Sequence, residues 1–410
     1  FPIQNLPFGI FSRSADKSPR VGVAIGELIL DLKFLAENGL LNTTTVAADF
    51  FQHQETLNEF MGRGPAAWRE VRGLVSNLLR HDVGTLRDHG VWREQALVPQ
   101  ADVRMHLPVR IENYTDFYSS REHATNVGTM LRGPQNALMA NWVHLPVAYH
   151  GRASSVVVSG TDFHRPLGQA KADAAPLPTF GPSRNLDFEL EMGFLVGPGN
   201  NLGGPIPVAA AAEHIFGMVL VNDWSARDIQ KWEYQPLGPF LAKNFATSIS
   251  PWVVTLDALE PFRVPGPLQD PQPLPYLQTS GDWNYDVHLE VWLQSDKMPA
   301  PRRICASNSR YLYWNICQQL AHHTCNGCNL RPGDLLASGT ISGPAADSFG
   351  SLLELTWKGT KPLALDAETR TFLEDGDRVT MTGWCQGKGY RVGFGTLSGR
   401  VLPARVFSEH

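Results

Sequence analysis

An alternation of apolar and polar residues in the middle of the chain predicts a β-strand that carries two carboxylates on one face. In segment 186–194, apolar residues alternate with Asp187, Glu189 and Glu191, and a period of two is typical of a half-buried strand. Side chains two apart point the same way, so Glu189 and Glu191 should stand side by side and repel one another. Either a cation such as Ca²⁺ or Mg²⁺ relieves this repulsion, or the face is solvated and has basic neighbours across the sheet. The alternation alone leaves both interpretations open.

The remaining pattern predicts a small N-terminal unit and a larger β-rich unit. Residues 20–32 predict a hairpin that turns at Gly26-Glu27. Apolar residues at helical spacing behind Pro65 predict an amphipathic helix that reaches Leu78. The extended run 97–109 predicts a crossing between units, with a boundary near 107, hence domains 1–107 and 108–410. Beyond it the pattern predicts strands at 154–160, 188–196, 217–221, 283–293, 352–357 and 378–384, and a helical patch at 310–323.

Composition narrows the class of protein. The chain has 410 residues, of which 43% are hydrophobic, and its 37 Gly and 30 Pro favour many turns and a β-rich fold. The net charge of -5 argues against nucleic acid and anionic membranes as partners, and no apolar run approaches the ~20 residues that span a bilayer. Five cysteines are an odd number for a disulfide framework, so a reducing compartment is expected.

His123 is a candidate general base. The spacing of Ser119 and Glu122 fits a capping box that starts a helix and places His123 in the first turn. The positive end of the helix dipole disfavours imidazolium, and a base needs the neutral ring. A histidine that simply packs or faces solvent is the alternative.

Three further residues could carry chemistry. Asp223 follows the apolar strand 216–221, where it could ligate a metal or cap the next helix. Lys243 could stabilise developing negative charge. Glu354 shares a face with apolar residues of the predicted strand 352–357, an odd place for a carboxylate unless it has a partner, and orienting a catalytic histidine is one possibility. The pair Cys325 and Cys328 is a weak zinc or redox signal, because a second cysteine pair is absent.

Taken together, several segments resemble the fumarylacetoacetate hydrolase family over nearly the whole chain. The most specific are 114–120 (Tyr-Thr-Asp-Phe-Tyr-Ser-Ser), 123–128 (His-Ala-Thr-Asn-Val-Gly), 149–155 (Tyr-His-Gly-Arg-Ala-Ser-Ser), 189–191, 222–228 (Asn-Asp-Trp-Ser-Ala-Arg-Asp) and 336–343. The resemblance implies a mainly β fold with some α, in which a small N-terminal SH3-like β-barrel domain precedes a large C-terminal mixed β-roll domain. It also implies a homodimer in the cytoplasm.

The resemblance also implies a set of site residues. Ca²⁺ ligands fall on Asp116, Glu189, Glu191 and Asp223, and a second, Mg²⁺ site falls on Asp223, Thr247 and the backbone carbonyl of Lys243. His123 matches the general base and Glu354 the carboxylate that orients it, while the oxyanion-stabilising group matches Arg227, Gln230 and Lys243. Substrate contacts fall on Tyr118, Arg132, Tyr149, Gln230, Tyr234 and Thr340. Members of the family carry a single cysteine where this chain has two, so the Cys325–Cys328 pair looks incidental.

The implied reaction is the metal-dependent hydrolysis of a carbon–carbon bond in 4-fumarylacetoacetate to fumarate and acetoacetate, the last step of tyrosine and phenylalanine catabolism. A rival interpretation is another member of the same superfamily, an acylpyruvate hydrolase or a 2-oxo acid decarboxylase, although these generally lack the N-terminal domain. A second rival is a non-catalytic β protein stabilised by Ca²⁺, which would have no use for His123.

Overall fold

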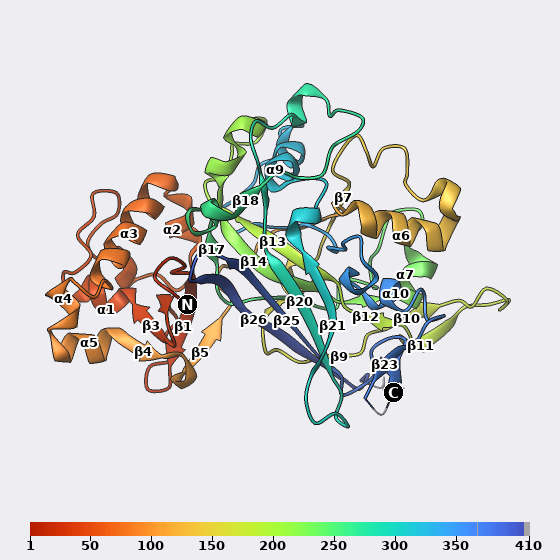
Figure 1. Cartoon of the computed structure of the whole chain (residues 1–410), viewed down its shortest axis with the longest axis horizontal. Coiled ribbons are helices and arrows are strands. Elements are labelled where there is room, and N and C mark those ends of the chain that lie inside the picture. Colours follow the sequence, from red (N-terminus) through yellow and green to blue (C-terminus); the bar gives the residue numbers. More distant parts are fainter. Residues whose placement is uncertain (367, 406–410) are drawn as a thin grey trace.

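A computed structural model describes residues 1–366 and 368–405, which form a smaller N-terminal lobe and a larger C-terminal lobe (Figure 1). The smaller lobe is built on a five-stranded antiparallel sheet, in the order β4 (Leu97–Pro99), β3 (Leu28–Asp31), β2 (Arg20–Ile25), β1 (Phe8–Arg13) and β5 (Val103–His106). Its helices are α1 (Leu32–Glu37), α2 (Asn58–Gly62), α3 (Pro65–Leu78), α4 (Gly84–Arg87) and α5 (Gly90–Ala96).

The sequence pattern predicted one hairpin and one helix of this lobe. The predicted hairpin is confirmed as β2 and β3, and Gly26 takes the positive φ of 56° that its turn requires. The predicted helix is confirmed as α3, with Pro65 in its first turn. The extended run after residue 97 is not a crossing, because it supplies β4 and β5, the two edge strands of one sheet. Three residues separate these edges, so the sheet curls into the half-barrel that the SH3-like prediction requires.

The larger lobe contains two extended sheets. One has the order β7 (Ala148–His150), β6 (Tyr114–Phe117), β22 (Leu335–Ala337), β13 (Leu190–Val196), β14 (Ile215–Asp223), β16 (Thr247–Ile249) and β8 (Val156–Val158), with β17 (Val254–Thr255) beside β14. The other has the order β21 (Arg302–Asn308), β20 (His288–Gln294), β25 (Arg378–Gln386), β26 (Arg391–Leu402) and β9 (Phe163–His164). The mainly β fold with some α, with a small half-barrel and a larger mixed-sheet lobe, is therefore confirmed.

Short ribbons and helices complete the larger lobe. The ribbons pair β10 (Leu167–Ala170) with β11 (Thr179–Pro182), β12 (Leu186–Asp187) with β15 (Ser225–Ala226), β18 (Arg263–Val264) with β19 (Asn284–Tyr285), and β23 (Leu363–Leu365) with β24 (Glu368–Arg370). The helices are α6 (Arg121–Arg132), α7 (Arg227–Glu233), α8 (Leu256–Leu259), α9 (Ile316–Thr324) and α10 (Leu352–Leu355). Short 3₁₀ helices lie at Phe50–Gln52, Gln100–Asp102, Pro134–Asn136, Ala153–Ser155, Val208–His214, Glu260–Phe262, Pro275–Leu277, Ser309–Tyr311 and Ala346–Ser348.

Five strand or helix predictions in this lobe need correction. The strand predicted at 154–160 is shortened to β8, and that at 283–293 is divided into β19 and β20. Segment 352–357 is not a strand, since it begins with the short helix α10 that Ser351 caps. The helical patch at 310–323 is shorter than expected, because α9 begins only at Ile316, behind the N-cap Asn315. The strand predicted from residue 186 is interrupted at Phe188 and Glu189, and it resumes as β13.

Strand β13 is buried on both faces, which contradicts the half-buried prediction. Leu190, Met192 and Phe194 join the core cluster that includes Leu289 and Val291 of β20 in the second sheet. On the other face, Leu195 joins a second cluster, whose members include Val21, Val23, Trp68 and Val71 of the smaller lobe. Glu191 shares this second face, so its carboxylate is enclosed by protein instead of water.

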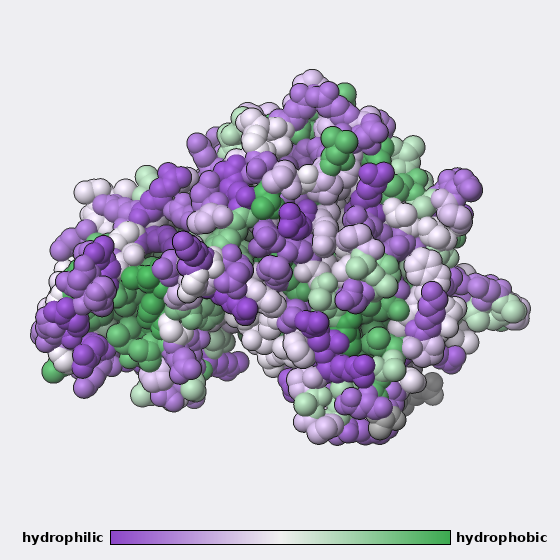
Figure 2. All heavy atoms as spheres, in the orientation of Figure 1, coloured by the Kyte–Doolittle hydropathy of each residue, from purple (hydrophilic) through white to green (hydrophobic). Residues whose placement is uncertain are grey.

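The two lobes are continuous through this second cluster, since Phe8 of β1 and Trp68 of α3 both pack on Phe216 of β14. The boundary near residue 107 therefore stays a prediction. Figure 2 shows a mainly hydrophilic face, with apolar residues gathered over the smaller lobe and over the lower part of the larger lobe. Within the described part of the chain, no helix is long and apolar enough to cross a membrane.

Candidate active site and metal centre

Four buried carboxylates converge on one face of the larger mixed sheet. Asp116 lies on β6, Glu191 on β13 and Asp223 at the end of β14, while Glu189 directly precedes β13. Strand β22 separates β6 from β13 and places only the small Ala337 opposite Asp116. One oxygen of each carboxylate lies within 4.8 Å of the others, and at most 5% of any of these four residues is exposed. The four predicted ligands thus come together, and the solvated-face interpretation of Glu189 and Glu191 is wrong.

Several oxygens in this cluster have no hydrogen-bond partner among the described residues. They are both carboxylate oxygens of Glu191 and Oδ1 of Asp116. Burial, and then the charges of neighbouring carboxylates, raise the pKa of Asp116 and of Glu191 well above the ordinary range. Buried carboxylate oxygens that lack donors are the ligands a hard divalent cation takes. The residues present therefore fit a divalent metal.

Two cations already pair with one side of the cluster. The ammonium of Lys243 donates to Glu189 and, at 2.7 Å, to Asp223, and Arg227 donates to Glu189 at 2.6 Å. Burial raises the pKa of Glu189, but the charges of Lys243 and Arg227 outweigh it and hold that pKa below the ordinary range. Glu189 is therefore ionised and already paired, whereas Glu191 has no such cation in contact.

Asp223 is held by neutral donors as well. Thr247 on β16 and Tyr149 on β7 donate their hydroxyls to its two oxygens at 2.6 and 2.8 Å. The alternative that Asp223 caps the following helix is wrong, because the N-cap of α7 is Ala226. Both oxygens of Asp223 thus have partners. The unpartnered oxygens favour one cation beside Glu191, but they do not support a second cation beside Thr247.

His123 and Glu354 form a buried pair beside the cluster. Nδ1 of His123 lies 2.6 Å from the Glu354 carboxylate, which also accepts hydrogen bonds from Asn126, Ser342 and Ser351. Burial raises the pKa of Glu354, but His123 and these donors outweigh it and lower the pKa overall. Because an ionised carboxylate only accepts, Nδ1 carries the proton and Nε2 is left as the free acceptor.

The helix prediction around His123 is confirmed with a shifted cap. The N-cap of α6 is Ser120, whose hydroxyl accepts from the His123 backbone N–H at 3.2 Å, and not Ser119. His123 still occupies the first turn, and it is 3% exposed, so the solvent-facing alternative is wrong. Glu354 reaches it from α10 and not from a strand.

Arg227 links the cluster to α10 through Asp187. Its Nε donates to Asp187 at 2.8 Å, and Asp187 also accepts from the backbone N–H groups of Leu352 and Leu353 at the start of α10. Nη2 of Arg227 is buried and has no partner within the described chain, while Nη1 lies 3.3 Å from Gln230. One guanidinium nitrogen is thus left to donate to a bound molecule.

Asp187→Asn should destabilise the fold by about 3 kcal/mol, because it removes one partner of a buried ion pair. Denaturant unfolding at fixed metal concentration measures this change. The matched control is Asp375→Asn: Asp375 pairs with Arg165 at 2.7 Å but is 42% exposed, so we expect less than about 1 kcal/mol. Equal losses in the two variants would contradict the structural importance of Asp187.

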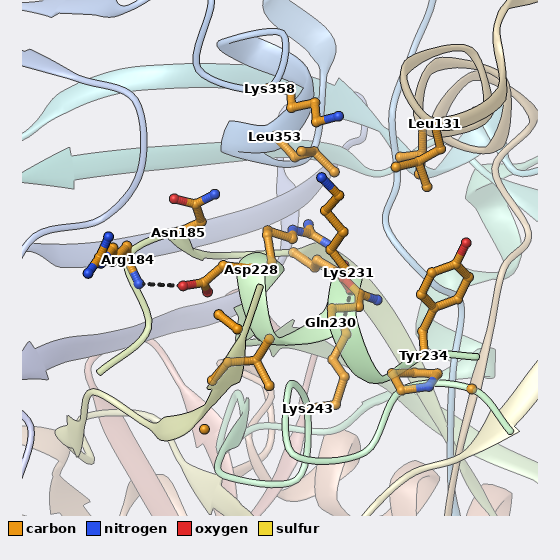
Figure 3. A pocket seen from close by; sticks show the side chains of 18 of the residues that line it. Leu131, Arg184, Asn185, Asp228, Gln230, Lys231, Tyr234, Lys243, Leu353 and Lys358 are labelled. Carbon is orange, nitrogen blue, oxygen red and sulfur yellow. Dashed lines mark hydrogen bonds and ion pairs between the residues drawn. The ribbon is translucent and has the colours of Figure 1, made fainter. Parts of the chain in front are cut away.

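A cavity of about 1070 Å³ opens over these groups (Figure 3). Most of the predicted site residues line it, namely Asp116, Tyr118, His123, Tyr149, Glu189, Arg227, Gln230, Tyr234, Lys243 and Thr340. Glu191, Asp223, Thr247 and Glu354 do not line the cavity themselves. Glu354 contacts the lining residue His123, and Asp223 contacts Tyr149 and Lys243. The hydroxyl of Thr340 is buried and unpartnered within the described residues, as expected of a group that bonds to a ligand.

Arg132 is the one predicted substrate contact that lies outside the cavity wall. Its guanidinium donates to the backbone carbonyls of Asn136 and Ala137, although the neighbouring Leu131 lines the cavity. The cysteine pair plays no part in the site: Cys325 and Cys328 are free thiols, and they do not belong to the metal-binding cluster found among the described residues.

Sequence reasoning missed several residues that support the site. Those around Glu354 and Arg227 are Asn126, Asp187, Ser342 and Ser351, and those at the cavity mouth include Lys231 and Lys358. Asp187 could have been found, since it alternates with Glu189 and Glu191. The others gave no signal, because single polar residues in loops and on helices such as α6 and α7 are common.

Comparison with known proteins agrees with this architecture. Residues 4–108 match the family "Fumarylacetoacetase N-terminal" and residues 112–402 match "Fumarylacetoacetate (FAA) hydrolase C-terminal". The chain is 59% identical to the fumarylacetoacetase of Homo sapiens over 405 residues (98% of this chain and 96% of that protein). It is 56% identical to that of Arabidopsis thaliana over 405 residues, with the same coverage.

Among solved structures, a fumarylacetoacetate hydrolase from the psychrophilic Exiguobacterium antarcticum shares the fold. Its TM-score is 0.54 at 17% sequence identity, covering 98% of this chain and all of that one. The chain is thus a hydrolase with a buried acidic cluster that fits a divalent metal. It belongs to the fumarylacetoacetate hydrolase family.

Proposed function

We propose that this chain hydrolyses the carbon–carbon bond of 4-fumarylacetoacetate to give fumarate and acetoacetate. One observation carries the proposal: His123, which Glu354 contacts, lines the same cavity as Asp116 and Glu189 of the acidic cluster. The chain is also 59% identical, over nearly its whole length, to a curated fumarylacetoacetase. The rival superfamily activities gain no comparable support, and a non-catalytic protein would have no use for the histidine pair.

Asp116, Glu189, Glu191 and Asp223 would hold a divalent cation, which supplies Lewis acidity toward the carbonyl oxygens of a β-diketone. We favour Ca²⁺ on the number of carboxylates. Four converge here, whereas Mg²⁺ is usually held by one or two carboxylates and keeps several waters. A separate Mg²⁺ would be taken by Asp223, Thr247 and the backbone carbonyl of Lys243, since an ammonium cannot ligate a cation.

His123 acts as the general base. Glu354 fixes the tautomer in which Nε2 is unprotonated, so this nitrogen takes a proton from a water molecule in the cavity. The water attacks the carbonyl nearer the fumaryl end. Burial of the pair keeps the ring oriented and excludes competing donors. General-base catalysis of this kind contributes roughly 10²–10⁴-fold in rate.

The tetrahedral oxygen that forms is stabilised by the group of Arg227, Gln230 and Lys243. Nη2 of Arg227 is the donor left free by the surrounding contacts, and the charges of Asp223 and Glu189 raise the pKa of Lys243 despite its burial, which keeps it protonated. The carbon–carbon bond then breaks, and the departing enolate takes up a proton to become acetoacetate. Each such donor is worth about 3–4 kcal/mol of barrier.

The cavity wall supplies the substrate contacts. Tyr118, Tyr149, Gln230, Tyr234 and Thr340 lie in the wall and would bind the substrate directly. Arg132 lies at the end of α6, where its charge acts on Tyr118, and it would reach the substrate only after releasing the carbonyls that it now contacts.

We further propose that the chain forms a homodimer in the cytoplasm and performs the last step of tyrosine and phenylalanine catabolism. Large apolar side chains at the cavity rim, such as Leu177 and Leu237, are 73% and 97% exposed, which suits a surface that a second copy covers. Free thiols at all five cysteines suit a reducing compartment. The domains would be 1–107 and 108–410.

The proposal predicts that purified protein consumes fumarylacetoacetate, followed by the loss of ultraviolet absorbance of the conjugated diketone. Turnover should stop in chelator and return when Ca²⁺ is added back. An acylpyruvate and a 2-oxo acid serve as competing substrates for the rival activities. No turnover of fumarylacetoacetate in metal-replete buffer, or faster turnover of a rival substrate, would overturn the proposed function.

A further inference from the structure

Helix α7 lies along the cavity. Its residues 227–231 and its C-cap Tyr234 line the cavity. Arg227 contacts the acidic cluster, and Lys231 follows it by one turn, about 6 Å along the axis. Lys231 therefore lies toward the mouth and carries a positive charge that the reaction chemistry does not use.

Lys358 reaches the same mouth from an unusual turn. Trp357 and Lys358, directly after α10, have φ angles of 47° and 59°, and Gly359 follows at 80°. Two consecutive non-glycine residues in the left-handed region cost conformational free energy. The turn therefore carries a lysine at a position where glycine or asparagine would be less strained. The Lys358 ammonium lines the cavity and has no ion-pair or hydrogen-bond partner among the described residues.

Figure 3 shows the side chains of Lys231 and Lys358 directed toward the same part of the cavity, with Leu353 between them. Lys231 pairs with the carboxylate of Asp173, which lies in the connection between β10 and β11. A hydrogen bond from Lys231, and then the charges of Lys231, Lys358 and Lys171, lower the pKa of Asp173. One protein carboxylate is thus already attracted to both lysines.

The positive charges of Lys231 and Lys358 favour the binding of a substrate carboxylate at this mouth. The proposed substrate carries a carboxylate at each end, and the end remote from the metal centre needs a cationic partner elsewhere in the cavity. Asp173 is 83% exposed in its pair with Lys231, and an exposed pair contributes little to stability. A substrate carboxylate can therefore replace Asp173 at small cost.

We propose that Lys231 and Lys358 form a carboxylate subsite at the cavity mouth, which binds the substrate carboxylate remote from the acidic cluster and which Asp173 occupies in the free protein. The inference rests on the proposed function and adds to it a determinant for dicarboxylates over monocarboxylates.

The test measures kcat and KM for fumarylacetoacetate and for two analogues, each with a methyl group in place of one carboxylate. Lys231→Gln and Lys358→Asn should each raise KM for fumarylacetoacetate about tenfold, with kcat changed less than about twofold, as expected for a lost charged hydrogen bond. Asparagine tolerates the left-handed conformation, so the second variant should fold. The lysine substitutions should raise KM for only one of the two analogues, namely the one that keeps the carboxylate bound at the subsite. Asp173→Asn should lower KM.

Lys361→Gln is the matched control, because Lys361 stands 5.8 Å over the Trp357 ring in the same turn and does not line the cavity. Unchanged KM values in both variants, or equal changes for both analogues, would overturn the subsite. Thermal shifts with fumarate and with acetoacetate report the subsite without turnover. If wild-type protein shows no turnover but one of these shifts disappears in the variants, the proposed function fails and the subsite stands; if neither shift depends on the lysines, the subsite fails.

Discussion

His123→Ala is expected to lower kcat for fumarylacetoacetate by about 10³-fold while leaving metal binding intact. The ring is held by Glu354 at 2.6 Å and lines the cavity beside the acidic cluster, so its loss removes the base but none of the four carboxylates. A positioned general base contributes about 10²–10⁴-fold. Steady-state kinetics at saturating Ca²⁺ measures the loss.

Two further variants make this result specific. His150 is an exposed histidine on β7, next to Tyr149, and His150→Ala should leave kcat unchanged. Glu354→Gln should lower kcat less than His123→Ala, and combining the two should cost little more than His123→Ala alone, since both act through one ring. If His123→Ala also removed the stabilisation by Ca²⁺, the residue would belong to the metal centre, and the base assignment would be wrong.

The alternation predicted that Glu189 and Glu191 point to the same face of a strand, but it could not decide whether a cation or solvent lies on that face. The answer depends on Asp116 and Asp223, which are distant in sequence and lie beside these residues only because β6 and β14 join the same sheet. Burial depends in the same way on distant segments, because the smaller lobe covers the face that the pattern suggested was solvated. The family resemblance, not the periodicity, gave the ligand set.

Glu354 shows how a predicted contact, here with His123, can form although the predicted local structure is wrong. Leu352, Leu353 and Leu355 fit a short buried strand as well as a single helical turn, and periodicity cannot separate the two over four residues. The hydroxyl of Ser351 accepts from the Glu354 backbone N–H, and Asp187 accepts from those of Leu352 and Leu353, so the caps decide in favour of the helix. Asp187 comes from a distant segment, and the local sequence of α10 does not predict it.

Glu191→Gln is expected to remove the stabilisation that Ca²⁺ gives the protein and to lower activity by at least about 10²-fold. Both carboxylate oxygens of Glu191 are buried and lack partners within the described chain, so they are the atoms with most to gain from a cation. A ligand that binds only the folded state at 100 times its Kd stabilises it by about 2.7 kcal/mol. Unfolding of wild type and variant, with Ca²⁺ and with chelator, measures this difference.

When chelator removes the metal, Glu191→Gln should stabilise the protein or leave its stability unchanged. Burial and the neighbouring carboxylates then disfavour the charged form of Glu191, and the neutral amide removes this cost. The variant should therefore unfold no more easily than wild type in chelator, although it is the less stable of the two in Ca²⁺. Glu122→Gln is the control, because Glu122 also has a buried unpartnered oxygen but lies on α6, outside the cluster. That variant should keep the full response to Ca²⁺. A Glu191→Gln protein with a wild-type response would show that the cation binds elsewhere.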